Sequence, residues 1–388
     1  MAKWKKCTLG DLVTFQRGHD LPRTQMKAGD YPVIGSNGII GYHNAYTTEA
    51  PSITVGRSGN VGKPFIYYGR TWSHNTSLYI KDFKGNDPVF IYYFLQTLNL
   101  THYAGGSAVP TLNRNHIHAL DVCVPCDVND QRTIGRYLQL LDEKITENQN
   151  INKNLEQQIR TLCNAWLNEY APFGGSCPND WELTPLASFA KFISGYSYKG
   201  GELQDSTIAM ATIKNFDRKG GFKLDGYKEI IPSSKLKPEH HAELFDTLVA
   251  HTDLTQNAEV IGNAEPVLSF SGYNDIIFSM DVVKVVPDNP AISKFLIAAM
   301  LQTQQFKGHC LGYVNGTTVL HLSKRALPEY SLRLPRDFKV LQPLNDAVSS
   351  MYQQMALNID ESVQLAALRD SLLPKLMSSE LDVSGIDL

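Results

Sequence analysis

The most regular pattern in the chain is a series of apolar residues between Ile134 and Trp166, spaced alternately four and three positions apart. This spacing places one apolar stripe along a helix, and such a stripe is the seam through which long helices pair. Two seam positions are polar, Asn148 and Asn152. Polar residues on a seam cost stability but can fix the register of a pair. The stretch therefore predicts a long helix that lies against another helix.

The same seam recurs 210 positions later in the chain. Its polar interruption recurs as well, at Asn358 and Ser362, and the one break in the pattern is Arg369, which stands where the first seam has Ile159. Two runs in one register predict that the helices pair with each other, antiparallel, within the chain. The residues expected at the centre of this pairing are Ile145, Asn148, Asn152, Leu155, Met355, Asn358, Ser362 and Leu365.

The segments that precede the two helices repeat too. Landmark residues recur at an offset of 177 positions near the start of each segment and of 210 positions near its end, so the second copy has additional residues in its middle. A repeated frame indicates a duplicated domain. The landmark pairs are Trp4 and Trp181, Leu9 and Leu186, Phe15 and Phe192, Gly18 and Gly195, Gly106 and Gly316, Val109 and Val319, Leu112 and Leu322, and Pro125 and Pro335.

Both segments show the same order of expected elements. Short β-like runs broken by Gly, Asn and Pro predict strands at 31–34, 52–55, 77–80 and 281–286. An Asp-Pro or Asn-Pro pair then opens an apolar helix, which we predict over 89–99 and over 291–306. The fold class is therefore α+β, with two β-rich globules in tandem, each followed by one long helix.

The repeat also predicts where the chain divides. The stretch 171–180 is rich in Gly and Pro and has no periodicity, so it is read as a linker. The expected parts are a first globule over 1–130, a long helix over 131–170, the linker, a second globule over 181–336 and a long helix over 337–378.

Composition limits the class of protein. The chain has 388 residues, and no apolar run approaches the roughly 18 residues that would span a membrane. No apolar stretch follows the basic N-terminus, so it is not read as a secretory signal. Six scattered cysteines suit a reducing compartment, and we expect a cytoplasmic protein. The net charge of −3 neither suggests nor excludes nucleic acid as a partner.

Motifs for catalysis are missing from the sequence. The string nearest to a phosphate-binding loop, residues 56–64, has the wrong spacing and ends in Pro64, where Ser or Thr would bind Mg²⁺. The Asp/Asn-Pro-Pro-aromatic motif of amino-methyltransferases does not occur. Cys123 and Cys126 form one C-x-x-C without a second pair, which does not indicate a metal site. We therefore expect neither catalysis nor a bound metal.

The first segment carries loops suited to binding. Residues 35–44 and 54–64 are rich in Gly, which allows a ligand to approach the backbone closely. Arg and Lys suit phosphates, whereas Arg, Asn, Gln and His can read base edges. The alternative reading, hairpin turns with solvated charges, stays open. The candidate DNA contacts are Ser36, Asn37, His43, Asn44, Arg57, Lys63, Arg70, His74 and Asn75.

The second segment places a different set of polar residues on the same frame, so the two segments should read different sequences. Its basic stretch surrounds two phenylalanines, and its loop over 251–262 supplies Thr, Gln and Asn. The candidates are Tyr196, Tyr198, Lys214, Asn215, Arg218, Lys219, Thr252, Thr255, Gln256 and Asn257.

Four stretches give the chain a family resemblance: YPVIGSNGIIGYHN at 31–44, VGRSGNVGK at 55–63, LVAHTDLTQNAEVIG at 248–262 and LRDSLLPKLMSSEL at 368–381. With its duplicated plan, the chain resembles a specificity subunit of a type I restriction–modification system over nearly its whole length. The first long helix departs from this pattern, since it reads Leu-Cys-Asn-Ala-Trp at 162–166 instead of a Leu-Leu-Pro-Lys string.

The resemblance implies a DNA-recognition subunit of bacterial defence without catalysis of its own. Each target-recognition domain would read one half of a bipartite, asymmetric site in double-stranded DNA, while the helices fix the spacing and dock two modification (adenine methyltransferase) subunits. ATP-hydrolysing restriction subunits are a further partner in such systems. S-adenosylmethionine, and ATP with Mg²⁺, would belong to those partners, so no cofactor is expected on this chain.

Two other readings stay open at this point. The chain could be the recognition module of another type of restriction–methylation enzyme, which the neighbouring genes would reveal. It could also be a coiled-coil scaffold whose globules bind protein or carbohydrate, which a test of duplex DNA binding would distinguish.

Overall fold

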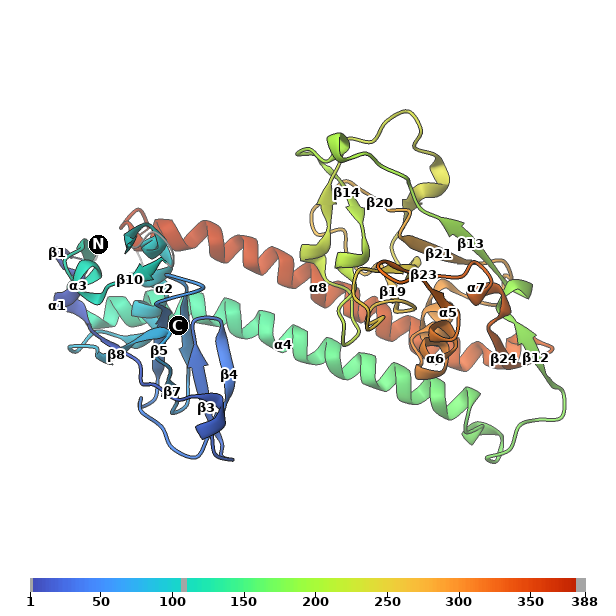
Figure 1. Ribbon diagram of the computed structural model, residues 1–388, viewed down its shortest axis with the longest axis horizontal. Helices are drawn as coiled ribbons and strands as arrows, with labels where there is room; N and C mark the ends of the chain where they lie inside the picture. Colours follow the sequence, from blue (N-terminus) through green and yellow to red (C-terminus); the bar gives the residue numbers. More distant parts are fainter. Residues whose placement is uncertain (1–2, 106–109, 382–388) are drawn as a thin grey trace. The chain divides into compact units, whose positions relative to one another are not determined.

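The computed structural model describes residues 3–105 and 110–381, so the landmarks Gly106 and Val109 lie outside the described residues. It divides into two compact units, one formed by Met1–Ile145 and Leu365–Leu388 and the other by Thr146–Gln364. The boundary crosses both long helices, α4 (Val128–Leu167) and α8 (Gln342–Met377), so each unit contains a part of each helix (Figure 1). No helix in the described ranges is both long and apolar enough to cross a bilayer.

The first unit is built on small sheets. Its four-stranded antiparallel sheet has the order β2-β8-β5-β6, a three-stranded sheet has the order β4-β3-β7, and β1 pairs with β11 and β9 with β10. The strands are β1 (Trp4–Thr8), β2 (Thr14–Arg17), β3 (Tyr31–Gly35), β4 (Gly38–His43), β5 (Ser52–Gly56), β6 (Pro64–Tyr67), β7 (Trp72–Ser73), β8 (Ser77–Asp82), β9 (Ala104–Gly105), β10 (Thr111–Leu112) and β11 (Asp121–Pro125). The helices are α1 (Leu9–Leu12), α2 (Pro88–Thr97) and α3 (Arg114–His118), with 3₁₀ turns η1 (Arg23–Gln25) and η2 (Leu100–Tyr103).

Helix α2 forms the centre of the first core. The Asp87 carboxylate accepts a hydrogen bond from the Phe90 N–H at 2.9 Å, and Pro88 occupies the first turn, where its missing N–H costs nothing. Phe90 and Ile91 are buried in one cluster with sheet residues and with Leu376 near the end of α8. The helix predicted over 89–99 is confirmed, although it ends at Thr97.

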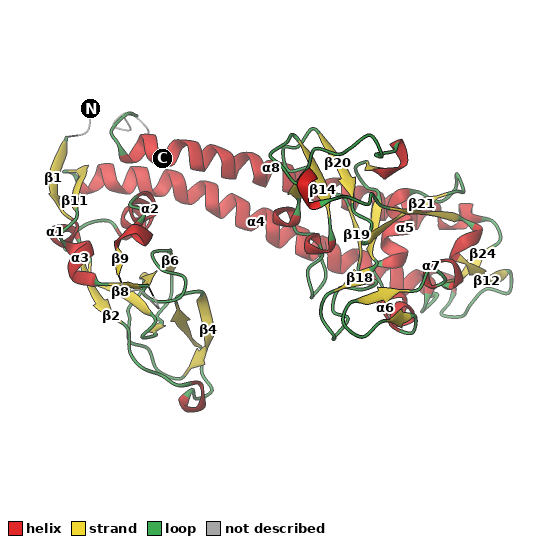
Figure 2. Cartoon of the chain, turned by 45° about the horizontal axis from the view of Figure 1, so that its top comes forward, coloured by secondary structure: helices red, strands yellow, loops and turns green. Residues whose placement is uncertain are grey.

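The second unit has the same kinds of elements with more strands. Its sheets have the orders β13-β21-β17-β19, β15-β14-β20-β16 and β18-β23-β22, and β12 pairs with β24. Figure 2 shows the strands confined to the two globules. The strands are β12 (Trp181–Pro185), β13 (Ala190–Ser194), β14 (Ile208–Ala211), β15 (Lys228–Glu229), β16 (His241–Ala242), β17 (Thr247–Ala250), β18 (Thr252–Asp253), β19 (Ala264–Pro266), β20 (Asp275–Phe278), β21 (Val282–Pro287), β22 (Val314–Asn315), β23 (Leu320–Leu322) and β24 (Ser331–Pro335). The helices are α5 (Lys294–Leu301), α6 (Gln304–Leu311) and α7 (Ala326–Glu329), with 3₁₀ turns η3 (Ala171–Phe173), η4 (Leu186–Ser188), η5 (Gly200–Glu202), η6 (Ile213–Asn215), η7 (Leu224–Gly226), η8 (Pro238–His240) and η9 (Phe338–Leu341).

The prediction of a single helix over 291–306 is wrong. Two shorter helices, α5 and α6, occupy this region. Ser293 caps α5 by accepting the Leu296 N–H at 3.1 Å, and Thr303 caps α6 by accepting the Phe306 N–H at 3.2 Å. A hydroxyl that takes the first N–H groups of a helix favours a new start over continuation.

The predicted antiparallel pairing of the long helices is confirmed within each unit. In the first unit, the Arg369 guanidinium on α8 pairs with the Asp142 carboxylate on α4 at 2.5 Å, which explains the arginine that breaks the second seam. In the second unit, Met355 is buried and Leu155 packs against the same core. Ile145 and Leu365 are half-buried in the first unit.

The polar interruption of the seam forms a hydrogen-bonded cluster in the second unit. The buried Asn148 amide donates to the Glu361 carboxylate at 2.7 Å and to the Ser362 hydroxyl at 3.3 Å. The Asn358 amide donates to the Asn152 side-chain oxygen at 2.8 Å. Because a buried amide without partners is costly, this arrangement favours one register of the pair.

Candidate nucleic-acid interface

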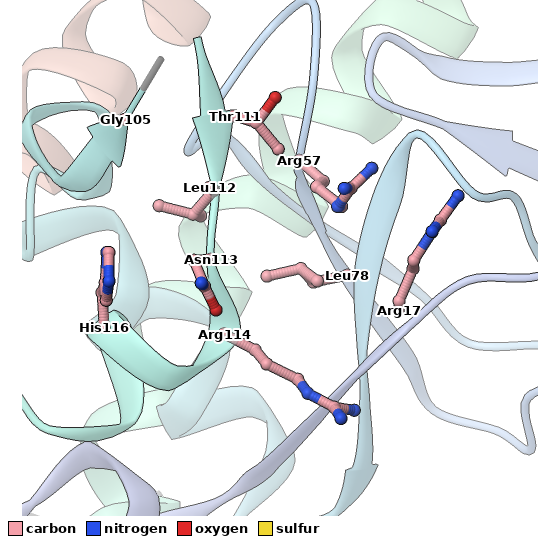
Figure 3. Close-up of a pocket in the computed structure, with 9 residues that line it drawn as sticks. All are labelled: Arg17, Arg57, Leu78, Gly105, Thr111, Leu112, Asn113, Arg114 and His116. Atoms are coloured by element: carbon pink, nitrogen blue, oxygen red, sulfur yellow. The ribbon is translucent and has the colours of Figure 1, made fainter.

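A basic hollow of about 500 Å³ lies on the first unit. Its cationic side chains come from three elements: Arg17 ends β2, Arg57 follows β5, and Arg114 begins α3 (Figure 3). His116 of α3 adds an imidazole. The remaining lining residues are Leu78, Gly105, Thr111, Leu112 and Asn113.

The hollow contains positive charge without matching negative charge. No Asp or Glu lines it, and among the residues that the structure describes none of its three guanidinium groups forms an ion pair. Burial, and after it the neighbouring Arg17, lower the pKa of Arg57. The Arg57 guanidinium makes one long contact, at 3.5 Å, with the Asn75 carbonyl. Crowded, unpaired guanidinium groups suit the binding of an anion.

The glycine-rich loop after β5 holds Arg57 in place. The Gly62 N–H donates to the Gly56 carbonyl at 2.8 Å, and the Arg57 N–H donates to the Thr76 carbonyl at 2.8 Å. A Cβ atom at Gly56 would stand 1.8 Å from the Asn60 carbonyl oxygen, so only glycine fits there. The loop closes on itself and turns the Arg57 side chain into the hollow.

Of the four candidates at 36–44, two are exposed and two are buried. Asn37 and Asn44 lie on the surface. His43 is buried, accepts the Lys27 N–H at 3.1 Å and packs edge-on against Trp72. Ser36 is also buried, beneath Gly59. The side chains of Ser36 and His43 therefore lie beneath the surface of the first unit, and their contact with DNA stays a prediction.

The other candidates of the first unit do not share the hollow with Arg57. Lys63 is exposed and lies over the Phe65 ring, and Arg70 pairs with Glu49 at 2.8 Å. His74 contacts the Thr76 hydroxyl at 3.0 Å, and burial lowers the pKa of its imidazole. The Asn75 amide donates to the Asp20 carboxylate.

Three candidates of the second unit are structural residues. Tyr196 is 1% exposed, and its hydroxyl contacts Glu202 at 3.1 Å. Asn215 is 0% exposed, and its amide donates to the Lys223 carbonyl at 2.8 Å. Thr252 is buried in β18. Their side chains are enclosed in the second unit, and their contact with DNA stays a prediction.

The remaining candidates of the second unit reach the surface to different degrees. Lys214, Lys219 and Asn257 are exposed. The side chains of the others are exposed or partly exposed but already contact other groups of the chain. Arg218 pairs with Glu259 at 3.1 Å, and the Thr255 hydroxyl donates to the Asp253 carboxylate at 2.8 Å. The Gln256 amide donates to the Thr317 carbonyl at 2.8 Å, and Tyr198 packs beside a buried cluster.

The two units share one backbone frame at the position of the hollow. The Leu112 N–H donates to the Arg57 carbonyl at 2.8 Å, and the Leu322 N–H donates to the His251 carbonyl at the same distance. The N–H groups of Arg57 and His251 in turn donate to Thr76 and Asp281 carbonyls, both at 2.8 Å. Arg57 and His251 are therefore equivalent positions with different side chains.

Sequence reasoning found Arg57 but missed Arg17, Asn113, Arg114 and His116. The sequence signal that could have identified them is their position beside residues that recur in both segments. Arg17 directly precedes Gly18, and Asn113 directly follows Leu112. What the sequence could not give was that strand order brings them together.

The profile of the type I restriction modification DNA specificity domain matches residues 1–157. This match covers 157 of the 388 residues, and it agrees with the resemblance of the chain to type I restriction–modification specificity subunits. The chain is 21% identical to the type I restriction enzyme MjaIX specificity subunit of Methanocaldococcus jannaschii over 323 residues, which cover 76% of this chain and 70% of that one. It is 25% identical to the EcoprrI specificity subunit of Escherichia coli over 127 residues, covering 31% of this chain and 32% of that one.

A solved structure shares the fold of this chain. It is the type I restriction–modification S subunit from M. genitalium, with a TM-score of 0.64 and 16% identity, and the match covers 99% of this chain and 97% of that one. At this identity the likeness concerns the fold alone.

Proposed function

We propose that this chain is a specificity subunit which recognises double-stranded DNA and that each unit reads one half of a bipartite, asymmetric site. The observation that carries the proposal is one backbone frame with different side chains in its two copies, seen at Arg57 and His251. A shared frame keeps a similar docking geometry, while different side chains meet different base edges.

The long helices would set the distance between the half-sites and dock two modification subunits. Each unit exposes large apolar side chains on its parts of these helices: Leu140 and Leu368 in the first, Ile151 and Leu357 in the second, with Leu357 64% exposed. Apolar side chains left in water on paired helices suit the binding of a partner protein. Restriction subunits would join the same assembly.

The subunit would direct chemistry that its partners perform. Methyl transfer from S-adenosylmethionine would take place in the modification subunits, which must also flip the target base, and ATP with Mg²⁺ would serve the restriction subunits. The sequence basis is the lack of the corresponding motifs between Met1 and Leu388.

Methylome sequencing tests the proposal. A host that expresses this subunit together with its modification subunit should acquire methylated adenines in one motif with two specified halves and an unread spacer. The same host with the modification subunit alone should lack that motif. A methylation pattern that does not depend on this subunit would refute the proposal.

A variant of the second unit assigns the halves. Lys219→Ala combined with Asn257→Ala removes two exposed polar side chains of that unit. We expect one half of the motif to relax or weaken while the other half stays unchanged. Changes in both halves would contradict the assignment of one half to each unit.

A further inference from the structure

The basic hollow of the first unit is too rich in charge to be explained by folding. Three arginines line it without a carboxylate among the lining residues, and Arg17 is near enough to Arg57 to lower the pKa of that guanidinium. Arg17 and Arg114 are exposed at the rim, whereas Arg57 is partly buried. Like charges held together in a folded chain are unfavourable. An arrangement of this kind becomes favourable when an anion binds between the charges.

The lining favours a phosphate group over a base. A base that enters a pocket is held by stacking on aromatic faces and by hydrogen bonds to its edge. Among the described residues that line the hollow, the His116 imidazole is the only ring, and Arg17, Arg57 and Arg114 offer donors without acceptors. Guanidinium forks match phosphate oxygens in geometry and charge.

We propose that Arg17, Arg57 and Arg114 form a clamp for one backbone phosphate of the DNA at the first half-site. This inference rests on the proposed function, and it names a contact that contributes affinity without reading sequence.

The second unit lacks this clamp at the equivalent place. Arg17 pairs with Leu78 in the first unit as Ser194 pairs with Val283 in the second, so Ser194 takes the place of Arg17. His251 takes the place of Arg57, and burial, followed by His321 and Lys324, lowers the pKa of its imidazole. At the offset of 210 positions, Lys324 stands where the first unit has Arg114, so the second unit keeps one of the three cations and the complete clamp belongs to the first unit.

The test measures binding of the assembled complex with modification subunits to duplex DNA that carries the full site, over a range of salt concentrations. Arg17→Gln and Arg114→Gln each remove a charge at an exposed position. In each variant the salt dependence should fall by up to about one phosphate contact, or 0.9 in the slope of log K against log salt. Affinity for unrelated DNA should fall in parallel, and the methylated motif should stay the same.

Arg325→Gln is the matched control. Arg325 lies beside Lys324 in the second unit, and its guanidinium is already paired with Glu329 at 2.6 Å. Its removal should leave the salt slope unchanged. Loss of discrimination at a single base pair in Arg114→Gln would overturn the clamp in favour of base reading, and an unchanged slope in both clamp variants would remove it altogether.

Neutral methylphosphonate linkages locate the phosphate without dependence on how well the variants fold. The neutral linkage is placed at one position of the first half-site at a time. At one position it should lower the DNA affinity of the wild-type complex without lowering the affinity of the Arg114→Gln complex any further. Additive losses at every position would overturn the assignment. A wild-type complex that does not bind the site would refute the proposed function itself, whereas normal wild-type binding with unaffected variants would refute only the clamp.

Inorganic phosphate, titrated into the subunit and its Arg17→Gln variant by calorimetry, distinguishes a free anion from DNA. The DNA assignment expects weak binding that the variant reduces, together with the loss of DNA affinity. Tight binding of inorganic phosphate combined with unchanged DNA binding by the variant would assign the hollow to a free phosphate instead.

Discussion

The carboxyl group of Glu265 provides a pH-dependent test of how the second unit holds its basic loop. Glu265 lies on β19, is 5% exposed, and accepts hydrogen bonds from the Gly221 N–H at 2.7 Å and the Gln302 amide at 2.5 Å. Gly221 follows the exposed Arg218 and Lys219. Burial raises the pKa of Glu265 to about 7. The hydrogen bond from Gly221 opposes this shift, and the nearby Glu156 adds to it.

The sign of the effect follows from linkage. A carboxyl group whose pKa rises on folding stabilises the fold below its unfolded pKa of 4.5 and loses that contribution as the pH rises to about 7. Since one pKa unit corresponds to about 1.4 kcal/mol, the whole shift amounts to roughly 3 kcal/mol. Glu265→Gln cannot ionise and loses about one hydrogen bond, worth about 1 kcal/mol. The variant should therefore match the wild type at pH 5 and exceed it by about 2 kcal/mol at pH 8.

The assay must report on the second unit alone, because two units need not unfold together. The protein is unfolded in urea at each pH and then given a brief hydrogen-exchange pulse under common conditions. Mass spectrometry of peptides from β17 and β21 then reports the unfolding of the second unit. Glu239→Gln, a substitution at an exposed carboxylate, should follow the wild type at both pH values. A difference between Glu265→Gln and wild type that is the same at pH 5 and pH 8 would refute the reasoning.

Three further predictions concern the long helices. Asn148→Ala removes the donor to three acceptors on the other helix and should lower the unfolding free energy by about 1–3 kcal/mol in urea, whereas the exposed Asn150→Ala should change it little. Arg369→Leu removes the Arg369 guanidinium from the half-buried Asp142 carboxylate and should lower the unfolding free energy by about 1–2 kcal/mol. Arg336→Leu, whose ion pair is exposed, should cost less than about 0.5 kcal/mol, and equal losses would contradict the role of burial. Inserting four residues after position 145 and four after position 364 lengthens each long helix by about 6 Å. The spacer of the methylated motif should then grow by about two base pairs, while both specified halves stay unchanged. An unchanged spacer in a stable variant would mean that the helices do not set the spacer length.

The paired helices could be predicted because their signal is local and occurs twice. Apolar spacing identifies each helix without knowledge of the fold, and a shared polar interruption identifies the partner. The exception to the apolar pattern also has a structural reason, because Arg369 lies opposite Asp142 on the other helix and pairs with it. By contrast, the break between α5 and α6 depends on Thr303, and a single capping hydroxyl inside an apolar run is a weak signal.

The hollow could not be predicted because its residues meet only through the order β2-β8-β5. Arg17, Arg57 and Arg114 are distant in sequence, and no periodicity links them. The polar candidates that the structure buries show the opposite problem. Asn215 and His43 stand in turn-rich stretches typical of binding loops, yet such loops also need side chains that satisfy their own backbone N–H and carbonyl groups.

These two uses of polar residues bear on how the subunit can change specificity. Asn215 holds η6 through the Thr212 N–H and the Lys223 carbonyl, so its replacement would disturb the frame. Exposed residues such as Asn37 and Lys219 support no such backbone contacts with their side chains in the described part of the chain. Substitution at the second kind of position alters what the surface offers to DNA at little cost in stability. A frame secured by buried polar residues thus allows two copies of one fold to diverge in what they recognise.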